Sequence, residues 1–514
     1  MNNSTAFSTT RFLLLWAGTF LYLSAHAQGG FSRLYPEGSG TGNILYDHPY
    51  IITAAQTSDS NAQRGIIFYR FNLNGDTLFT RTHFETSRDI HPGFQNSLIK
   101  STDGSYILTG YRLPESYILK LDTNFNIQDS VFFKAYGEWT GALSMTEASN
   151  GDFLVTGSTY QPDSVTQQPR KGFLAARFDA DLNPKWIKRF HTPSVNGKVV
   201  EQQAHNVMED SKGNIWLGGY RLAQLQDNGS DALVIALDSV GNKILEKVLG
   251  NPALSEGIAT VVEAPDSNYF IATIIGDNLV DLGNNPQSRC KLRVLEMDIG
   301  GTILWDKAYG SPLALNYISN CEKTKDGYLS SGYYLDWDRD FTQRDAFYRS
   351  FSFKTNFNGD SIWYREYIAG SIHSDWNRLF DLSVTPDGGF VAGGHFSSDV
   401  SPLTGQAGSH VWIIKADSLG CVVPRCQYVS LPESEPKTSI NLYPNPTHGS
   451  FYLQGLQGKT LSLRVYDASG QEVLYQESIS EGEAIQLNEQ PSGLYMLQLL
   501  ERGEVLFRKK IVKH

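Results

Sequence analysis

The sequence predicts an all-β fold whose larger part is a seven-bladed β-propeller. Aromatic residues make up 12% of the chain, charged residues only 19%, and there are 47 glycines. This composition favours half-buried strands joined by tight turns over long helices. A unit of one turn and one strand returns seven times along the chain. The composition changes after residue 426, where a linker is expected to lead into a second, smaller β-domain.

The first 27 residues have the pattern of a signal peptide. Arg11 precedes an apolar run at residues 12–23, and small residues stand at positions 25 and 27, the two that a signal peptidase recognises. The run is too short to span a bilayer of about 30 Å as a stable helix. We therefore expect cleavage between Ala27 and Gln28 and no transmembrane segment in the mature chain. Retention as a signal anchor is the alternative.

The repeated unit is a tight polar turn that leads directly into an apolar strand. Residues 103–109 (DGSYILT) and 387–393 (DGGFVAG) show it most clearly. The other copies lie at residues 47–53, 150–157, 212–219, 266–272 and 326–332. The second residues of successive turns are 47 to 62 residues apart, a period close to that of known blade repeats.

Each unit contains further strand-like runs, so that one unit holds four short strands. A second strand ends at an Asp turn, as at residues 118–122, and an aromatic third strand follows, as at residues 303–309. One more run precedes the next turn, as at residues 380–385. Four strands in about 50 residues are typical of a propeller blade. A single sheet cannot bury both faces, whereas sheets packed radially bury them against each other.

The last unit lacks an outermost strand, and the start of the mature chain offers one. Residues 31–37 are similar to residues 132–138, the outer strand of the second unit. We expect residues near 30–37 to pair with the last unit and close the ring, which removes an exposed edge. The alternative architecture is a set of two or three separate β-sandwiches, which does not account for seven repeated units.

Export makes disulfides available to the four cysteines of the chain. Cys421 and Cys426 flank a short proline-containing turn and are the candidate disulfide. Cys290 and Cys321 would pair only by elimination, so their state stays open. The sequence has no C-x-x-C pair, and no zinc site is predicted.

A polar, proline-bearing linker at residues 427–438 separates the propeller, residues 28–426, from a C-terminal domain at residues 439–514. The C-terminal domain carries a YPNP entry, a VYDASG hairpin, a PSGLY strand and a basic, apolar terminus. The residues that define these motifs are Tyr443, Pro444, Asn445, Pro446, Gly449, Asp467, Gly470, Gly493, Tyr495, Lys509 and Lys510.

These motifs, in this order and at the end of the chain, resemble the type A C-terminal sorting domain of the type IX secretion system. The resemblance implies an immunoglobulin-like β-sandwich. It also implies two partners, an outer-membrane translocon that recognises the domain and a sortase-like peptidase that often removes it. The expected location is the cell surface or the medium, reached via the periplasm, in a bacterium of the Bacteroidetes type. A small β-sandwich used for adhesion is the alternative.

The propeller repeats resemble those of secreted bacterial propellers with the consensus D-G-G-F-x-x-x-G. Residues 387–420 are the nearest match within the chain. The pattern is shared by proteins of many functions, so the resemblance implies a fold and not an activity.

Charge and motifs argue against several function classes. The net charge is −11, from 43 basic and 54 acidic residues, which argues against nucleic-acid binding. The H-E-x-x-H, G-x-S-x-G and P-loop motifs are absent from the sequence. No cofactor is predicted. Gly38, Gly40 and Gly42 are expected to be a flexible connection, and the histidines are scattered among turns and strands.

One acidic segment has a weak resemblance to a calcium-binding loop. Asp336, Asp338 and Asp340 alternate as the first ligands of such a loop do, and they could hold Ca²⁺. The glycine and the closing glutamate of a calcium loop are missing. An acidic surface loop is therefore the simpler interpretation.

Two function classes remain, and the catalytic residues of any enzyme are unknown. The first is a non-enzymatic binding protein whose blade-connecting loops contact an extracellular glycan or protein. The second is a secreted carbohydrate-active hydrolase with its site in the propeller funnel. A glycosidase needs two facing carboxylates. Converging carboxylates with Trp or Tyr platforms would favour the enzyme, and a funnel of mixed, unconvergent residues would favour binding.

Overall fold

The computed structural model describes residues 30–135, 139–162, 169–192, 200–223, 230–250, 256–281, 286–310, 315–336, 347–370, 375–422, 440–456, 461–467, 472–501 and 504–513. The predicted signal peptide with Ala27 and Gln28, the linker at 427–438, Cys426 and Gly470 lie outside these ranges. Within them every regular element is a strand, which confirms the all-β prediction. No helix in these ranges is long and apolar enough to cross a membrane.

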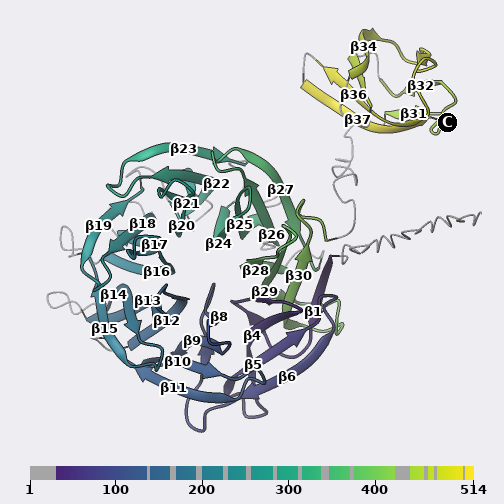
Figure 1. Ribbon diagram of the computed structural model, residues 1–514. Helices are drawn as coiled ribbons and strands as arrows, with labels where there is room; N and C mark the ends of the chain where they lie inside the picture. Colours follow the sequence, from purple (N-terminus) through teal and green to yellow (C-terminus); the bar gives the residue numbers. More distant parts are fainter. Residues whose placement is uncertain are drawn as a thin grey trace, which may run out of the picture. The chain divides into compact units, whose positions relative to one another are not determined.

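The chain divides into two compact units, Met1–Pro424 and Arg425–His514. The first unit consists of small antiparallel sheets arranged radially around a centre, as Figure 1 shows. Three sheets have four strands each, in simple sequence order. They comprise β12 (Trp139–Glu147), β13 (Phe153–Pro162), β14 (Pro169–Phe178) and β15 (Pro184–Phe190); β16 (Val200–Glu209), β17 (Ile215–Ala223), β18 (Ser230–Leu237) and β19 (Lys243–Val248); and β20 (Thr260–Glu263), β21 (Tyr269–Asp281), β22 (Pro286–Met297) and β23 (Ile303–Tyr309).

Two further sheets have the same order, but their first strand is interrupted, so that two short strands pair with one long neighbour. They comprise β2 (Gly40–Thr41), β3 (Leu45–Asp47), β4 (Tyr50–Ser58), β5 (Arg64–Phe71) and β6 (Thr77–His83); and β7 (His91–Pro92), β8 (Leu98–Lys100), β9 (Tyr106–Arg112), β10 (Glu115–Leu121) and β11 (Ile127–Phe133). Gly38–Gly42 was predicted to be a flexible connection, but β2 pairs with β4 in this segment.

The remaining sheet of the first unit has eight strands. Its two groups of four are β24 (Leu315–Thr324), β25 (Gly327–Asp336), β26 (Phe347–Thr355) and β27 (Ser361–Tyr367); and β28 (Trp376–Val384), β29 (Phe390–Ser398), β30 (Gly408–Ala416) and β1 (Phe31–Tyr35). Only one parallel bridge, between Tyr348 and Trp376, joins β26 to β28. In Figure 1 the last strand of each group, such as β11, β15, β19 and β23, lies at the outer edge. The arrangement is propeller-like.

The two ends of the first unit meet in an antiparallel strand pair. β1 lies against β30 in a register that runs from Phe31 opposite Lys415 to Tyr35 opposite Val411. The Ser32 hydroxyl accepts a hydrogen bond of 2.9 Å from the Trp412 indole nitrogen. Residues almost 400 positions apart in sequence thus complete one four-stranded group.

Polar turns between the strands explain why Asp and Gly recur in the sequence. At residues 238–242, the Asp238 carboxylate accepts backbone N–H bonds from Val240 and Asn242, at 3.1 and 2.7 Å. Gly241 has a φ of +79°, a conformation that a residue with a Cβ adopts only with strain. The same Asx turn with a positive φ recurs at Asp417 and Gly420.

The core of the first unit lies between neighbouring sheets. Trp216 of β17 and Tyr269 of β21 pack with ring centroids 3.7 Å apart. Both donate to the Asp210 carboxylate, Trp216 at 3.1 Å and Tyr269 at 2.7 Å. Such contacts bury the apolar faces that one sheet alone would leave exposed.

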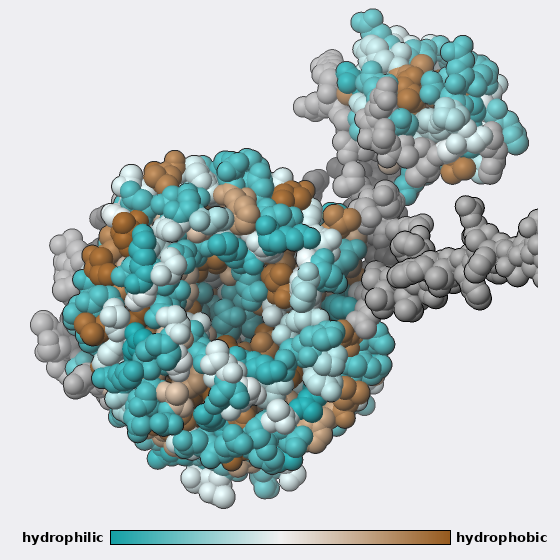
Figure 2. Space-filling model, in the orientation of Figure 1, coloured by the Kyte–Doolittle hydropathy of each residue, from teal (hydrophilic) through white to brown (hydrophobic). Residues whose placement is uncertain are grey.

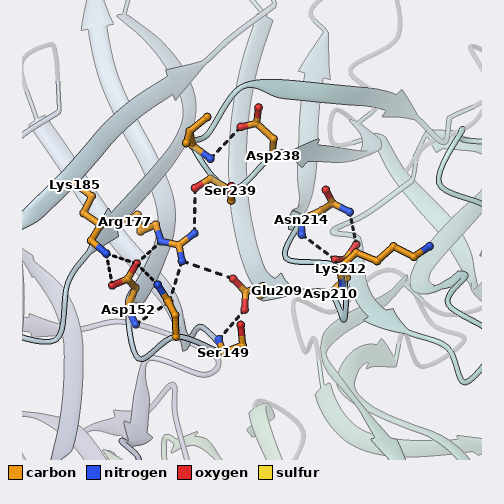
Figure 3. A network of polar contacts seen from close by, with 12 residues as sticks. Ser149, Asp152, Arg177, Lys185, Glu209, Asp210, Lys212, Asn214, Asp238 and Ser239 are labelled. Carbon is orange, nitrogen blue, oxygen red and sulfur yellow. Dashed lines mark hydrogen bonds and ion pairs between the residues drawn. The ribbon is translucent and has the colours of Figure 1, made fainter.

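An ion-pair network, shown in Figure 3, joins the sheets of β12–β15 and β16–β19. The Arg177 guanidinium, from β14, contacts Asp152 at 2.6 Å and Glu209 at 3.8 Å. It also donates to the carbonyl of Ser239 at 3.0 Å. Lys185 pairs with Asp152 from the other side, at 2.7 Å. The buried charges are thus partnered across the junction of two sheets.

The second unit contains two small sheets. One comprises β31 (Asn441–Tyr443), β32 (Ser450–Gln454) and β35 (Ile485–Gln486), and the other β34 (Glu472–Ile479), β33 (Leu461–Tyr466), β36 (Gly493–Glu501) and β37 (Glu504–Lys513). A single apolar core, which includes Phe451 and Leu463, lies inside this unit.

Candidate functional site

In the second unit, the YPNP entry motif lies beside the last strand of the chain. The side chain of Asn445 accepts a hydrogen bond of 2.9 Å from the backbone N–H of Val512 and donates one of 2.6 Å to the carbonyl of Lys510. The backbone N–H of Thr447 donates to the carbonyl of Val512 at 2.8 Å. The YPNP segment therefore covers an edge of β37, and motifs more than 60 residues apart meet.

The contact between Thr447 and Val512 continues as a parallel bridge between Thr447 and Lys513. The Lys513 ammonium group donates to the carbonyl of Asn488 at 3.1 Å and to that of Gln490. The end of β37 is thus held from two sides by segments that precede it in the chain.

Two predicted motif residues of this unit have clear structural roles. Gly449 has a φ of +140°, and a Cβ built on it would clash with the side-chain oxygen of Asn488. Tyr495 is buried, and its hydroxyl donates to the carbonyl of Pro491 at 2.5 Å. Burial, with a smaller effect of the Asp467 carboxylate, raises the pKa of Tyr495. These residues shape the unit from within.

Other motif residues face solvent or the strand edge. Tyr443 is 47% exposed and stacks on Tyr452, with ring centroids 5.8 Å apart. Lys509 and Lys510 are partly buried and stand opposite Leu497 and Met496 in the pairing of β36 with β37. Gly493 begins β36 opposite Lys513. The motif residues therefore lie both inside the unit and at its surface.

In the first unit, aromatic pairs recur between the first and second strands of several sheets. The pairs with stacked rings are His91–Tyr111, Trp139–Tyr160 and Tyr317–Tyr333, with centroids 4.9, 5.1 and 4.9 Å apart. In each pair the two residues stand opposite each other where the first strand begins and the second ends. Because the sheets repeat one strand order around the centre, these pairs lie on the same face of the unit.

A pocket of about 310 Å³ lies on this face, between sheets from the two ends of the first unit. Its lining residues are Ser39, Gly40, Thr41, Gly42, Gln56, His91, Pro92, Gly93, Phe94, Tyr111, Phe380, His395 and Ser409. Figure 2 shows that one face of the first unit is hollowed at its centre. We call the space lined by these residues the mouth pocket.

The mouth pocket combines aromatic rings with neutral polar groups. The rings of Phe94 and Phe380 meet edge to face, with centroids 6.1 Å apart. Burial lowers the pKa of His91, and it lowers that of His395 to about 4, with a smaller effect from the charge of Arg378. Both imidazoles are therefore uncharged at neutral pH. No Asp or Glu is among the described residues that line the pocket.

The glycine-rich segment shapes one wall of the mouth pocket. A Cβ built on Gly40 would lie 2.9 Å from the ring of His395, and one on Gly42 would lie 2.9 Å from the backbone of Phe94. Glycine at these two positions lets the backbone approach the pocket residues closely. The histidines His91 and His395, scattered in sequence, both line this pocket.

A buried carboxylate near the pocket connects sheets instead of facing a ligand. Asp381 is fully buried, and its Oδ2 accepts backbone N–H bonds from Ile44 and Asn96, both at 3.0 Å. Its Oδ1 accepts from the side chain of Asn320 at 2.6 Å and from Leu382 N at 3.0 Å. Burial raises the pKa of Asp381, and the backbone donors lower it in part. The carboxylate is thus satisfied by residues from several sheets.

Glu322, on β24, is a second carboxyl group whose pKa is raised by burial. It accepts a hydrogen bond of 3.0 Å from Val384 N on β28. Burial raises the pKa of Glu322 to about 7. Neither Glu322 nor Asp381 lines the mouth pocket, so these two carboxylates do not face a shared space there.

The predicted disulfide and the predicted acidic segment each include residues that lie outside the described ranges. Cys421 is disulfide-bonded, and Cys426, the predicted partner, lies outside the described residues. Cys290 and Cys321 are buried as thiols. Asp338 and Asp340 also lie outside the described residues, which hold no group of three or more His, Cys, Asp or Glu arranged for a metal ion.

Comparison with known families agrees with the geometry of the second unit. Residues 441–514 match the family described as Secretion system C-terminal sorting domain. The type IX resemblance is confirmed, and the chain is exported to the cell surface or secreted. No curated protein sequence matches the chain.

Several solved structures are similar to this chain at low identity. A protein of unknown function from Dyadobacter fermentans is 11% identical, with 75% of this chain and 99% of that chain covered and a TM-score of 0.38. The WD40 domain of Toxoplasma gondii coronin is 9% identical, with coverage of 76% and 86% and a TM-score of 0.39. An α-L-arabinanase from Penicillium chrysogenum is 12% identical, with coverage of 64% and 94% and a TM-score of 0.38. Similarity at this level carries no information on ligand or activity.

Proposed function

We propose that this chain is an exported, non-enzymatic binding protein, in which a seven-bladed propeller binds an extracellular glycan at the mouth pocket. In this proposal the second unit is an immunoglobulin-like sandwich that the type IX translocon recognises and a sortase-like peptidase removes. The mature chain begins at Gln28, and a disulfide between Cys421 and Cys426 closes the end of the propeller.

The strand order supports seven blades. Five separate sheets each provide one four-stranded group, if an interrupted first strand is counted once. The eight-stranded sheet provides two more groups, because a single bridge, Tyr348 to Trp376, joins its halves. Pairing of β1 with β30 supplies the outermost strand of the last group. Each group then has the four strands of a blade.

The observation that supports a glycan as the ligand is the set of residues that line the mouth pocket. Its aromatic rings, including Phe94, Tyr111 and Phe380, offer flat apolar faces, while the hydroxyl groups of Ser39 and Ser409 are neutral polar groups in its lining. Apolar faces beside a few convergent polar groups suit a sugar ring, which has C–H faces and a hydroxyl rim. The absence of a carboxylate from the described lining favours binding over glycoside hydrolysis.

A binding experiment tests the ligand. The mature full-length chain is screened against immobilised oligosaccharides, and a bound one is titrated by calorimetry. Phe94→Ala is expected to weaken binding about tenfold, which corresponds to about 1.4 kcal/mol. Phe94 is 37% exposed, so its removal should leave the fold intact. Phe84→Ala is the matched control, because Phe84 is 42% exposed and is not in the pocket lining.

Two results would count against this proposal. One is an absence of binding to any glycan in the panel, which removes the proposed ligand class. The other is the release of new reducing ends from a bound oligosaccharide, which identifies a hydrolase instead of a binding protein.

A fractionation experiment tests the role of the second unit. The full chain and a version that ends at Lys437 are expressed in a Bacteroidetes host, and periplasm, cell surface and medium are probed. Truncation is expected to hold the protein in the periplasm. Equal export of both versions would show that the second unit is not the export signal.

A further inference from the structure

We infer that the ligand of the mouth pocket carries a carboxylate, as a uronic acid does, and that Arg378 binds it. This inference rests on the proposed function, since it names the chemical class of glycan at the same site. It depends on the surroundings of Arg378, on the hydrogen-bond donors that this residue leaves unused, and on its position beside the pocket.

Arg378 is held among aromatic rings. Its guanidinium carbon lies 4.0 Å from the ring centroid of Tyr348, 4.3 Å from that of Trp376 and 5.3 Å from that of Tyr333. Tyr333 in turn stacks on Tyr317. Cation–π contacts fix the orientation of a guanidinium without using its N–H groups.

The guanidinium of Arg378 has a donor without a partner. Among the described residues, the buried Nε of Arg378 has no hydrogen-bond partner, and Arg378 forms no ion pair with an Asp or Glu there. Trp376, which stacks on it, is 42% exposed, so the cluster borders solvent. A planar fork of oriented N–H donors matches the two oxygens of a carboxylate.

Arg378 is not in the lining of the mouth pocket but lies next to residues that are. On β28, Arg378 precedes the pocket residue Phe380 by two positions, and it stands opposite the pocket residue His395 on β29. The ring of Phe380 also lies 5.8 Å, between centroids, from that of Tyr333. A sugar in the pocket can therefore extend towards the guanidinium while it keeps contact with aromatic faces.

The charge around the pocket favours an anionic ligand. The described pocket lining has no carboxylate to compete for Arg378. The pKa of His395, lowered to about 4 by burial and by Arg378, leaves this imidazole neutral. The site thus carries a local positive charge in a chain whose net charge is −11. Such a site distinguishes acidic from neutral sugars.

The experiment compares oligouronates with the same oligosaccharides after reduction of their carboxyl groups. The mature full-length chain is expected to bind the acidic form at least about tenfold more tightly, and this preference should weaken with added salt. Arg378→Gln is expected to abolish the preference, so that this variant binds the acidic and the reduced form with equal affinity. Arg378→Lys, which keeps the charge but not the planar fork, should retain only part of it.

Controls separate the effect of Arg378 from that of net charge and of folding. Lys188→Gln removes one positive charge from β15, far from the pocket in sequence and not in its lining, and should leave the preference intact. Thermal unfolding of each variant checks the fold.

The outcomes distinguish this inference from the proposed function. Equal binding of acidic and reduced forms by the unaltered chain would overturn the inference and leave the proposed function standing. Binding of no glycan at all would overturn both. Tighter binding of a sulfated glycan, lost in Arg378→Gln, would show that the site takes an anion other than a carboxylate and would overturn the assignment to uronic acids.

Discussion

Buried carboxyl groups in the first unit illustrate how single residues connect sheets. Asp381 accepts four hydrogen bonds, from Ile44, Asn96, Asn320 and Leu382. A carboxyl group whose acceptor sites are filled in this way has little capacity left for a substrate. Its partners lie in segments from both ends of the unit, so one side chain connects residues near 44 with residues near 381.

Glu322 is a single residue that should make the free energy of unfolding depend on pH. Burial raises the pKa of Glu322 from 4.5 to about 7, so the folded state binds a proton that the unfolded state releases. Stability is therefore expected to fall as the pH rises from about 4.5 to about 7. Glu322→Gln should remove this part of the dependence. The pH dependence is measured by thermal unfolding of the unaltered chain and of Glu322→Gln from about pH 4.5 to about pH 7. Identical pH profiles of the two proteins would contradict the prediction.

At the scale of elements, the strand β1 should stabilise the first unit by closing it. β1 covers β30 through five paired positions and accepts the Trp412 indole hydrogen bond at Ser32. Deletion of residues 28–36 would leave the edge of β30 unpaired and uncover apolar side chains of the core that includes Tyr35 and Val411. We expect a large fall in the unfolding temperature and stronger binding of a hydrophobic dye.

The single substitution Ser32→Ala is the control for this deletion. It removes one hydrogen bond, to Trp412, and should cost about 1 kcal/mol while the strand stays paired. A deletion variant as stable as the Ser32→Ala variant would show that β1 does not close the unit.

At the scale of the whole molecule, the two units have separate cores. The core cluster of the second unit contains residues from Ile440 to Ile511, and the core clusters of the first unit are built from residues of that unit. The chain from Gln28 to His514, which still carries the second unit, is therefore expected to unfold in two transitions. A version that ends at Lys437 should keep one transition at an unchanged temperature. Calorimetry measures the transitions of the two versions. A shift in the midpoint of the first unit's transition after truncation would indicate that the units stabilise each other.

Local sequence patterns were sufficient to predict the all-β fold, the repeated turns and the sorting motifs. Asx turns such as Asp238 with Gly241 form between residues a few positions apart, so their signal is present in any short window of sequence. The YPNP entry could likewise be recognised as a motif, although the hydrogen bonds of Asn445 to β37 could not be foreseen.

The mouth pocket and the surroundings of Arg378 were decided by tertiary structure alone. His91 and His395 looked scattered in sequence, and the segment of Gly40 was predicted to be only a connection, yet all three line one pocket. No local pattern contains this information, because pairing and packing of strands bring together residues that are hundreds of positions apart. Propensity and turn chemistry act between near neighbours, whereas the site depends on which sheet edges meet.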